Sequence, residues 1–203
     1  MSSSGLWALV ALGLGVVMVR QRSAAVGLVT VQALVLVAVA LDDAHSAGDL
    51  AAALALSARA VGLAVLFGLL AARTPETSPV RAGTGPIVRA AAAIALVLTL
   101  TWLIPSFGLV SRDAERAVLA LVGFGLVTAC TRRATLLQIV GIVLVENGLA
   151  LAALELPGVS AILIELGVAL DLTLIALVAA AFHLRIFAEF GSGDSALLRG
   201  LRD

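Results

Sequence analysis

Apolar runs of about 20 residues recur along the whole chain, with short polar segments between them. That length allows an α-helix to cross the hydrocarbon core of a bilayer. The runs lack the alternation of membrane β-strands, and spanning helices satisfy their own backbone hydrogen bonds. The pattern therefore predicts an all-α, polytopic membrane helix bundle of about seven transmembrane helices, at 5–19, 24–41, 50–72, 87–104, 115–131, 134–154 and 159–184.

Composition agrees with this class of protein. The 203 residues are 62% hydrophobic and 13% charged, whereas soluble domains are about 25% charged. A net charge of zero gives no reason to expect a nucleic-acid partner. The single cysteine, Cys130, makes no intrachain disulfide or cysteine-ligated cluster. No CxxC, HExxH, P-loop or GxGxxG motif is present, so we expect no catalytic residue, metal or cofactor in this chain.

Charge is distributed unevenly between the polar segments. Arginines gather in alternate segments and at the C-terminal end: Arg20, Arg22, Arg73, Arg81, Arg89, Arg132, Arg133, Arg185, Arg199 and Arg202. The segments between them are acidic: Asp42, Asp43, Asp49, Asp113, Glu115 and Glu155. The positive-inside rule then predicts an N-terminus outside and a C-terminus in the cytoplasm. Trp7 and Trp102 fall at outer helix ends, where interfacial aromatic residues are common.

One long polar linker, residues 73–86, is rich in Pro, Thr and Gly, and we expect it to be cytoplasmic. It lies within a four-helix N-terminal part, residues 1–113. A three-helix part follows at 114–190, and residues 191–203 form a short cytoplasmic tail.

Four ionisable residues fall inside predicted spans: Arg59, Glu146, Glu165 and Asp171. Each costs roughly 2.5–3.5 kcal/mol on insertion scales, so a functional role is the default hypothesis. Their uncharged polar companions are Thr30, Gln32, Gln138, Asn147 and Thr173.

The depths of these groups suggest a layer parallel to the membrane. At about 1.5 Å of rise per residue, Glu146 and Asp171 lie roughly 18 Å from the edge where their helices begin. Glu165 and Arg59 lie about 9 to 14 Å from the outer edge on the same basis. A low dielectric favours the neutral carboxyl, a nearby cation favours the carboxylate, and such groups with water can pass a proton. We therefore predict that Glu146, Asp171 and Glu165 transfer protons and that Arg59 tunes their ionisation.

Plainer interpretations stay open for several of these residues. Glu155 precedes a Leu-Pro-Gly turn signal and is expected to be a solvated loop acid. Arg59 has the alternative of extending its head group to the outer surface, and Glu165 that of facing an outer water pocket. His183, at an inner helix end, fits a packed or solvated residue as well as relay support alongside Gln138 and Asn147. His45 lies in an acidic outer loop and is expected to have no role.

The stretch from Arg132 to Phe187 resembles the C-terminal part of hydrogenase-4 component E. That family supplies a membrane subunit of formate hydrogenlyase and related group 4 [NiFe]-hydrogenase complexes. The specific features are ENG at 146–148 and E-x-G-x-x-x-D at 165–171. The segment 32–37, QALVLV, is also similar, so the resemblance covers nearly the whole chain.

The resemblance implies a place in a complex I-like assembly of a bacterial or archaeal cytoplasmic membrane. The last three helices are similar to the K subunit of respiratory complex I, whose two adjacent-helix glutamates belong to a lateral proton path. Glu146 matches the first of these, and Asp171 best matches the second. The family carries a lysine near the position of Arg59, and an arginine, unlike a lysine, stays charged when buried.

The implied function is that of an accessory subunit in a redox-driven proton or cation pump. Its expected partners are antiporter-like subunits, a subunit like the H subunit of complex I, membrane lipid and, indirectly, a soluble hydrogenase-like arm. Two alternatives remain, a subunit of a Mrp-type cation/proton antiporter and a purely structural scaffold. A stand-alone solute carrier ranks below them because the sequence shows no convincing internal repeat.

Overall fold

A computed structural model describes residues 3–42, 44–74, 84–156 and 161–191, without the side chains of 3, 71 and 161–174. Within these residues the chain forms seven α-helices. They are α1 (Ser3–Met18), α2 (Arg22–Asp42), α3 (Ala47–Arg73), α4 (Pro86–Leu103), α5 (Arg112–Thr131), α6 (Thr135–Leu154) and α7 (Ala161–Phe190). All seven predicted spans overlap these helices, although α7 continues six residues beyond its predicted end at 184.

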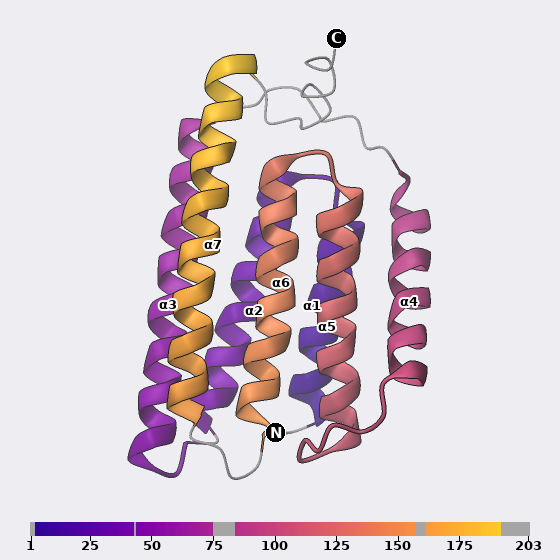
Figure 1. The fold of residues 1–203 in the computed structure, drawn as a ribbon, viewed down its shortest axis with the longest axis vertical. Helices are drawn as coiled ribbons and strands as arrows, with labels where there is room; N and C mark the ends of the chain where they lie inside the picture. Colours follow the sequence, from indigo (N-terminus) through magenta and orange to yellow (C-terminus); the bar gives the residue numbers. More distant parts are fainter. Residues whose placement is uncertain (1–2, 43, 75–83, 157–160, 192–203) are drawn as a thin grey trace.

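The helices stand in two packed rows (Figure 1). One row is α1–α2–α3 and the other is α5–α6–α7, while α4 packs beside α5 and α1 at the outside. Each helix contacts its counterpart, α1 with α5, α2 with α6 and α3 with α7. Consecutive helices run in opposite directions along the bundle (Figure 1). The two helices of each pair are four apart in the chain order, so they run in the same direction.

The closest packing joins α5 to α6. A Cβ added at Gly125 would lie 2.6 Å from Gly141 O and from Val145 N. A Cβ added at Gly141 would lie 2.6 Å from Ala129 N. Small residues at such positions let two helix backbones approach, which is a common device between membrane helices.

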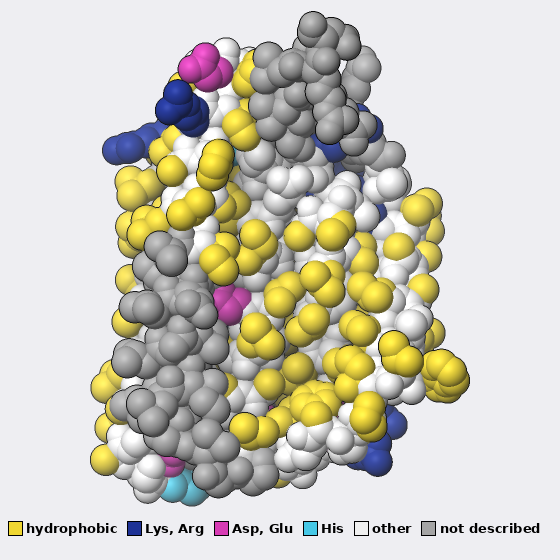
Figure 2. Space-filling model, viewed as in Figure 1, with side chains coloured by type: hydrophobic (Ala, Val, Ile, Leu, Met, Phe, Trp, Pro, Cys, Tyr) yellow, Lys and Arg dark blue, Asp and Glu magenta, His cyan; other side chains and the backbone are white. Residues whose placement is uncertain are grey.

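The outside of the bundle is apolar over most of its height. Five helices in the described part, α2 to α6, are long and apolar enough to cross a membrane. Figure 2 shows hydrophobic side chains over the middle of one face, and charged side chains gathered mainly at the two ends. Exposed large apolar residues, such as Leu98 and Trp102 of α4, are unusual in water and ordinary against lipid. The long apolar helices and the exposed apolar side chains indicate a multi-pass membrane protein.

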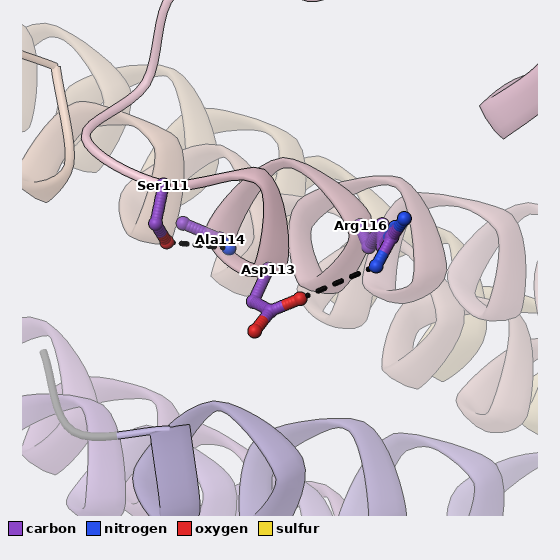
Figure 3. A network of polar contacts seen from close by, with 4 residues as sticks. All are labelled: Ser111, Asp113, Ala114 and Arg116. Carbon is purple, nitrogen blue, oxygen red and sulfur yellow. Dashed lines mark hydrogen bonds and ion pairs between the residues drawn. The ribbon is translucent and has the colours of Figure 1, made fainter.

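At the end of the bundle where the acidic segments lie, side chains cap the first turns of α3 and α5. Ser46 and Asp49 form a reciprocal capping box at the start of α3. At the start of α5, Ser111 Oγ accepts a hydrogen bond from Ala114 N at 3.1 Å (Figure 3). Asp113 and Arg116, three residues apart on the same helix, form an exposed ion pair at 3.4 Å.

Glu155 corrects one prediction. The residue ends α6 in a turn, as expected, but it is only 4% exposed and is not a solvated loop acid. Val110 N donates to Glu155 O at 3.1 Å, so the segment before α5 folds over the end of α6. Turn chemistry predicted the chain reversal, whereas burial depends on a loop 45 residues earlier.

Candidate functional site

A chain of hydrogen bonds crosses the interior of the bundle and joins four helices. Arg59 Nη2, on α3, donates to Asn147 Oδ1, on α6, at 2.7 Å. Asn147 Nδ2 donates to Gln32 Oε1, on α2, at 2.9 Å. Gln32 Nε2 donates to Leu9 O, on α1, at 2.8 Å. We call Arg59, Asn147 and Gln32 the arginine–amide chain.

The direction of this chain follows from its first member. A guanidinium has only donors, so Asn147 must turn its oxygen toward Arg59. The amide nitrogen of Asn147 then points at Gln32, whose oxygen must accept. The nitrogen of Gln32 is left to donate to a backbone carbonyl. Arg59 therefore sets the orientation of both amides.

Packing around the chain excludes solvent. Asn147 and Gln32 are fully buried, and Arg59 is 7% exposed. A Cβ at Gly13 of α1 would lie 3.3 Å from Gln32 Nε2 and 3.0 Å from Leu121 Cδ2, so a glycine there leaves room for the amide. Buried polar groups gain most when their partners are satisfied, so this network fixes the relative rotation of α2, α3 and α6.

Glu146 is the sequence neighbour of Asn147 in the arginine–amide chain and is also buried. It precedes Asn147 on α6 and is 6% exposed. One residue along a helix is a rotation of about 100°, so Glu146 faces a different neighbour from Asn147. Both the Glu146 carboxyl and the Arg59 guanidinium are buried, so solvent screens their charges little.

The chemistry open to these groups is limited and specific. Asn147 and Gln32 do not titrate, and an arginine retains its proton, so the arginine–amide chain is not itself a proton carrier. Its members can hold a positive charge in one place. Among the residues whose side chains the structure describes in this region, Glu146 is the group that can gain and lose a proton.

The structure brings some of the predicted residues together and separates others. Arg59 does not reach the outer surface; its guanidinium is buried against Asn147. Gln138, in contrast, donates to Arg132 O at 2.8 Å at the end of α5 and takes no part in the central region. The backbone of α7 is helical through Glu165 and Asp171, but their side chains lie outside the described residues.

His183 lies at the same end of the bundle as Gln138 and joins three helices. It is fully buried, not solvated. Thr74 Oγ1 donates to Leu70 O at 2.7 Å, so it accepts from His183 Nε2 at 3.3 Å. The proton is thereby assigned to Nε2, which leaves Nδ1 to accept from Thr135 Oγ1. This arrangement ties α7 to α3 and α6 and fits a packing role.

Sequence reasoning missed two features. Gln32 was only one of several polar companions, and no local signal pairs it with a residue 115 positions away. Arg89 and Arg132 were predicted as loop charges, yet both are buried. Among the residues that the structure describes, no three of His, Cys, Asp and Glu lie close enough to hold a metal ion.

Comparisons with known proteins add no relative to this picture. The chain matches no protein-family model, no curated protein and no solved structure. The geometry of the site and the sequence resemblance are therefore the basis of any functional proposal.

Proposed function

We propose that the chain is an accessory membrane subunit of a complex I-like, hydrogenase-type, redox-driven ion pump. In this role it has no active site of its own. Electron transfer takes place in a separate soluble arm, and antiporter-like subunits move the ions. The chain contributes intramembrane acids to a lateral path between these parts. The class of complex is taken from the resemblance to hydrogenase-4 component E.

The observation that carries the proposal is the arginine–amide chain with Glu146 beside it. The arginine–amide chain runs across the helices, from α3 through α6 and α2 to α1, rather than along them. A protein that only filled space would avoid burying Arg59 and Glu146, because each costs several kcal/mol at mid-membrane. Coupling between neighbouring helices uses such charges.

The proposed roles follow from the chemistry of each group. Glu146 is the proton carrier in the described region, and Asp171 and Glu165 extend the path along α7. Arg59 supplies a fixed positive charge that favours the carboxylate form of a neighbouring acid. Asn147 and Gln32 hold the guanidinium in place.

In the proposed orientation, the arginine-rich end faces the cytoplasm and seven helices cross the membrane. The ends of α1, α3, α5 and α7 meet at that end, with the start of α2, α4 and α6. The positive-inside rule supports this direction, and Trp7 and Trp102 then lie at the outer interface.

The test is to replace Glu146 and Asp171 by their amides in the intact complex, singly and together. Protons translocated per electron are measured in membrane vesicles, and the amount of assembled complex is measured in the same vesicles. We expect a loss of most proton translocation with electron transfer retained. Glu155→Gln is the matched control, since it removes a buried acid at a helix end.

Two results would reject the proposal. Unchanged translocation in the double amide variant would end the proton-path role. A fall in assembled complex that fully accounts for the lost translocation would instead favour the scaffold alternative.

A further inference from the structure

The arginine-rich end contains a second buried site, separate from the arginine–amide chain. Arg89, in the first turn of α4, is 1% exposed, and Arg132, which follows α5, is 6% exposed. Arg89 Nε donates to Val17 O at 3.2 Å, and Arg132 Nη2 donates to the same oxygen at 3.0 Å. Arg132 also contacts the carbonyls of Val16 and Val19. Two guanidiniums therefore meet at the C-terminus of α1.

The positive charge at this point exceeds its compensation. The carbonyl end of a helix supplies roughly half a negative charge, against two full positive charges from the arginines. In the described part of the chain, neither guanidinium contacts a carboxylate. Burial and the charge of Arg89 together lower the pKa of Arg132 to about 10, so its charged form is disfavoured there.

Three donors at the site have no acceptor among the described residues. They are Arg89 Nη2, Arg132 Nε and the hydroxyl of Thr84. The backbone of Thr84 is part of the same corner, because its carbonyl accepts from Arg89 Nη1 at 2.8 Å. Buried donors without acceptors are rare in native structures and call for an explanation.

The start of α4 adds to this excess of donors. Gly85 caps the helix without a side-chain hydrogen bond, and Pro86 follows it. The first helical hydrogen bond runs from Arg89 N to Gly85 O at 3.1 Å, so the N–H groups of Ile87 and Val88 have no partner within the helix. Such a helix start favours anions.

We propose that this corner binds the phosphate group of an anionic phospholipid in the leaflet at the arginine-rich end. A phosphate offers several oxygens to Arg89, Arg132 and Thr84 at once, and guanidiniums bind it strongly. Ile87 and Val88, 78% and 61% exposed, provide apolar surface for acyl chains next to the head group. Basic pockets between membrane helices are known to hold anionic head groups. This site does not depend on the proposed function.

The experiment uses the full chain, purified in detergent, stripped of lipid and reloaded. Native mass spectrometry measures binding of phosphatidylglycerol and of phosphatidylcholine. We expect phosphatidylglycerol to bind about tenfold more tightly, and Arg89→Gln to remove that preference. Arg133→Gln is the matched control, because Arg133 is an exposed arginine next to Arg132; its effect should stay below about twofold.

Thr84→Val protects the test against misfolding, since it removes one free hydroxyl and no contact between helices. We expect it to weaken phosphatidylglycerol binding about threefold while the melting temperature without lipid is unchanged. Equal binding of the two lipids by the unaltered chain would overturn the proposal. So would equal losses from Arg89→Gln and Arg133→Gln. Inorganic phosphate that displaces phosphatidylglycerol at millimolar concentration would overturn the lipid assignment in favour of a soluble phosphate.

Discussion

The protein buries arginines in two different settings. In the middle of the bundle, Arg59 donates to a side chain that is itself held by another side chain, and the arginine–amide chain ends on one backbone carbonyl. At the arginine-rich end, Arg89 and Arg132 both donate to the last carbonyls of α1, and one nitrogen of each guanidinium has no acceptor among the described residues. The central charge is thus positioned by amides from two other helices, whereas the terminal charges are positioned by a helix end. The same residue type serves orientation in one place and anion attraction in the other.

The largest expected effect comes from breaking the central chain at its middle. Asn147→Leu would leave the Arg59 charge buried without its amide partner and would also strand Gln32. The loss of one charged and one neutral buried hydrogen bond should lower the free energy of unfolding by about 2–4 kcal/mol. Denaturation of the purified chain in mixed micelles measures it. Gln138→Leu is the control on the same helix; it removes one bond to a backbone carbonyl and should cost only about 0.5–1.5 kcal/mol.

Removing the charge itself should be less harmful than removing its partner. Arg59→Met removes the charged donor to Asn147 Oδ1, and leaving this neutral oxygen unsatisfied should cost about 1–3 kcal/mol. The same unfolding measurement compares the two variants. A larger loss for Arg59→Met than for Asn147→Leu would show that the amides do not support the charge.

The terminal arginines should respond to alkaline pH. The pKa of Arg132 in the folded chain is about 10, well below the ordinary value for an arginine, so at pH values near and above 10 the unfolded chain binds more protons than the folded chain. The free energy of unfolding should therefore rise with pH in that window, by about 1 kcal/mol from about pH 9 to 11. Arg132→Gln should lack this rise. Parallel pH curves for the two proteins would contradict the burial of a charged Arg132.

The smallest effect is expected at the exposed start of α5. Arg116→Gln breaks the ion pair with Asp113. The side chains of Arg116 and Asp113 are 64% and 50% exposed, so the free energy of unfolding should change by less than about 0.5 kcal/mol. Ser111→Ala, which removes the cap beside it, should cost about 1 kcal/mol. An Arg116→Gln loss that exceeded the Ser111→Ala loss would show that exposed charges matter here as much as buried ones.

The helices could be predicted from sequence because a bilayer demands long apolar runs: all seven predicted segments overlap helices, and five helices in the described part are long and apolar enough to cross a membrane. Their pairing into two parallel rows could not be predicted. Apolar helices that face lipid on one side and protein on the other carry little directional pattern, and only details such as Gly125 and Gly141 mark a contact face.

The candidate site was predictable in part for the same reason. Arg59, Glu146 and Asn147 stood out because polar residues are rare in such runs. The link through Gln32 depends on how α2 and α6 are rotated, which is a tertiary property. The burial of Arg89, Arg132 and Glu155 was missed because each lies at a helix end, where local sequence predicts solvent and a neighbouring segment decides otherwise.

The most direct test of the central claim is a double-mutant cycle between Arg59 and Glu146 in the intact complex. Protons translocated per electron are measured for Arg59→Gln, Glu146→Gln and the two combined. If the fixed charge acts through the acid, the double variant should retain as much translocation as Glu146→Gln alone, and Arg59→Gln should fall between that value and the unaltered complex. Losses that multiply in the double variant, or full translocation in Arg59→Gln, would contradict the account.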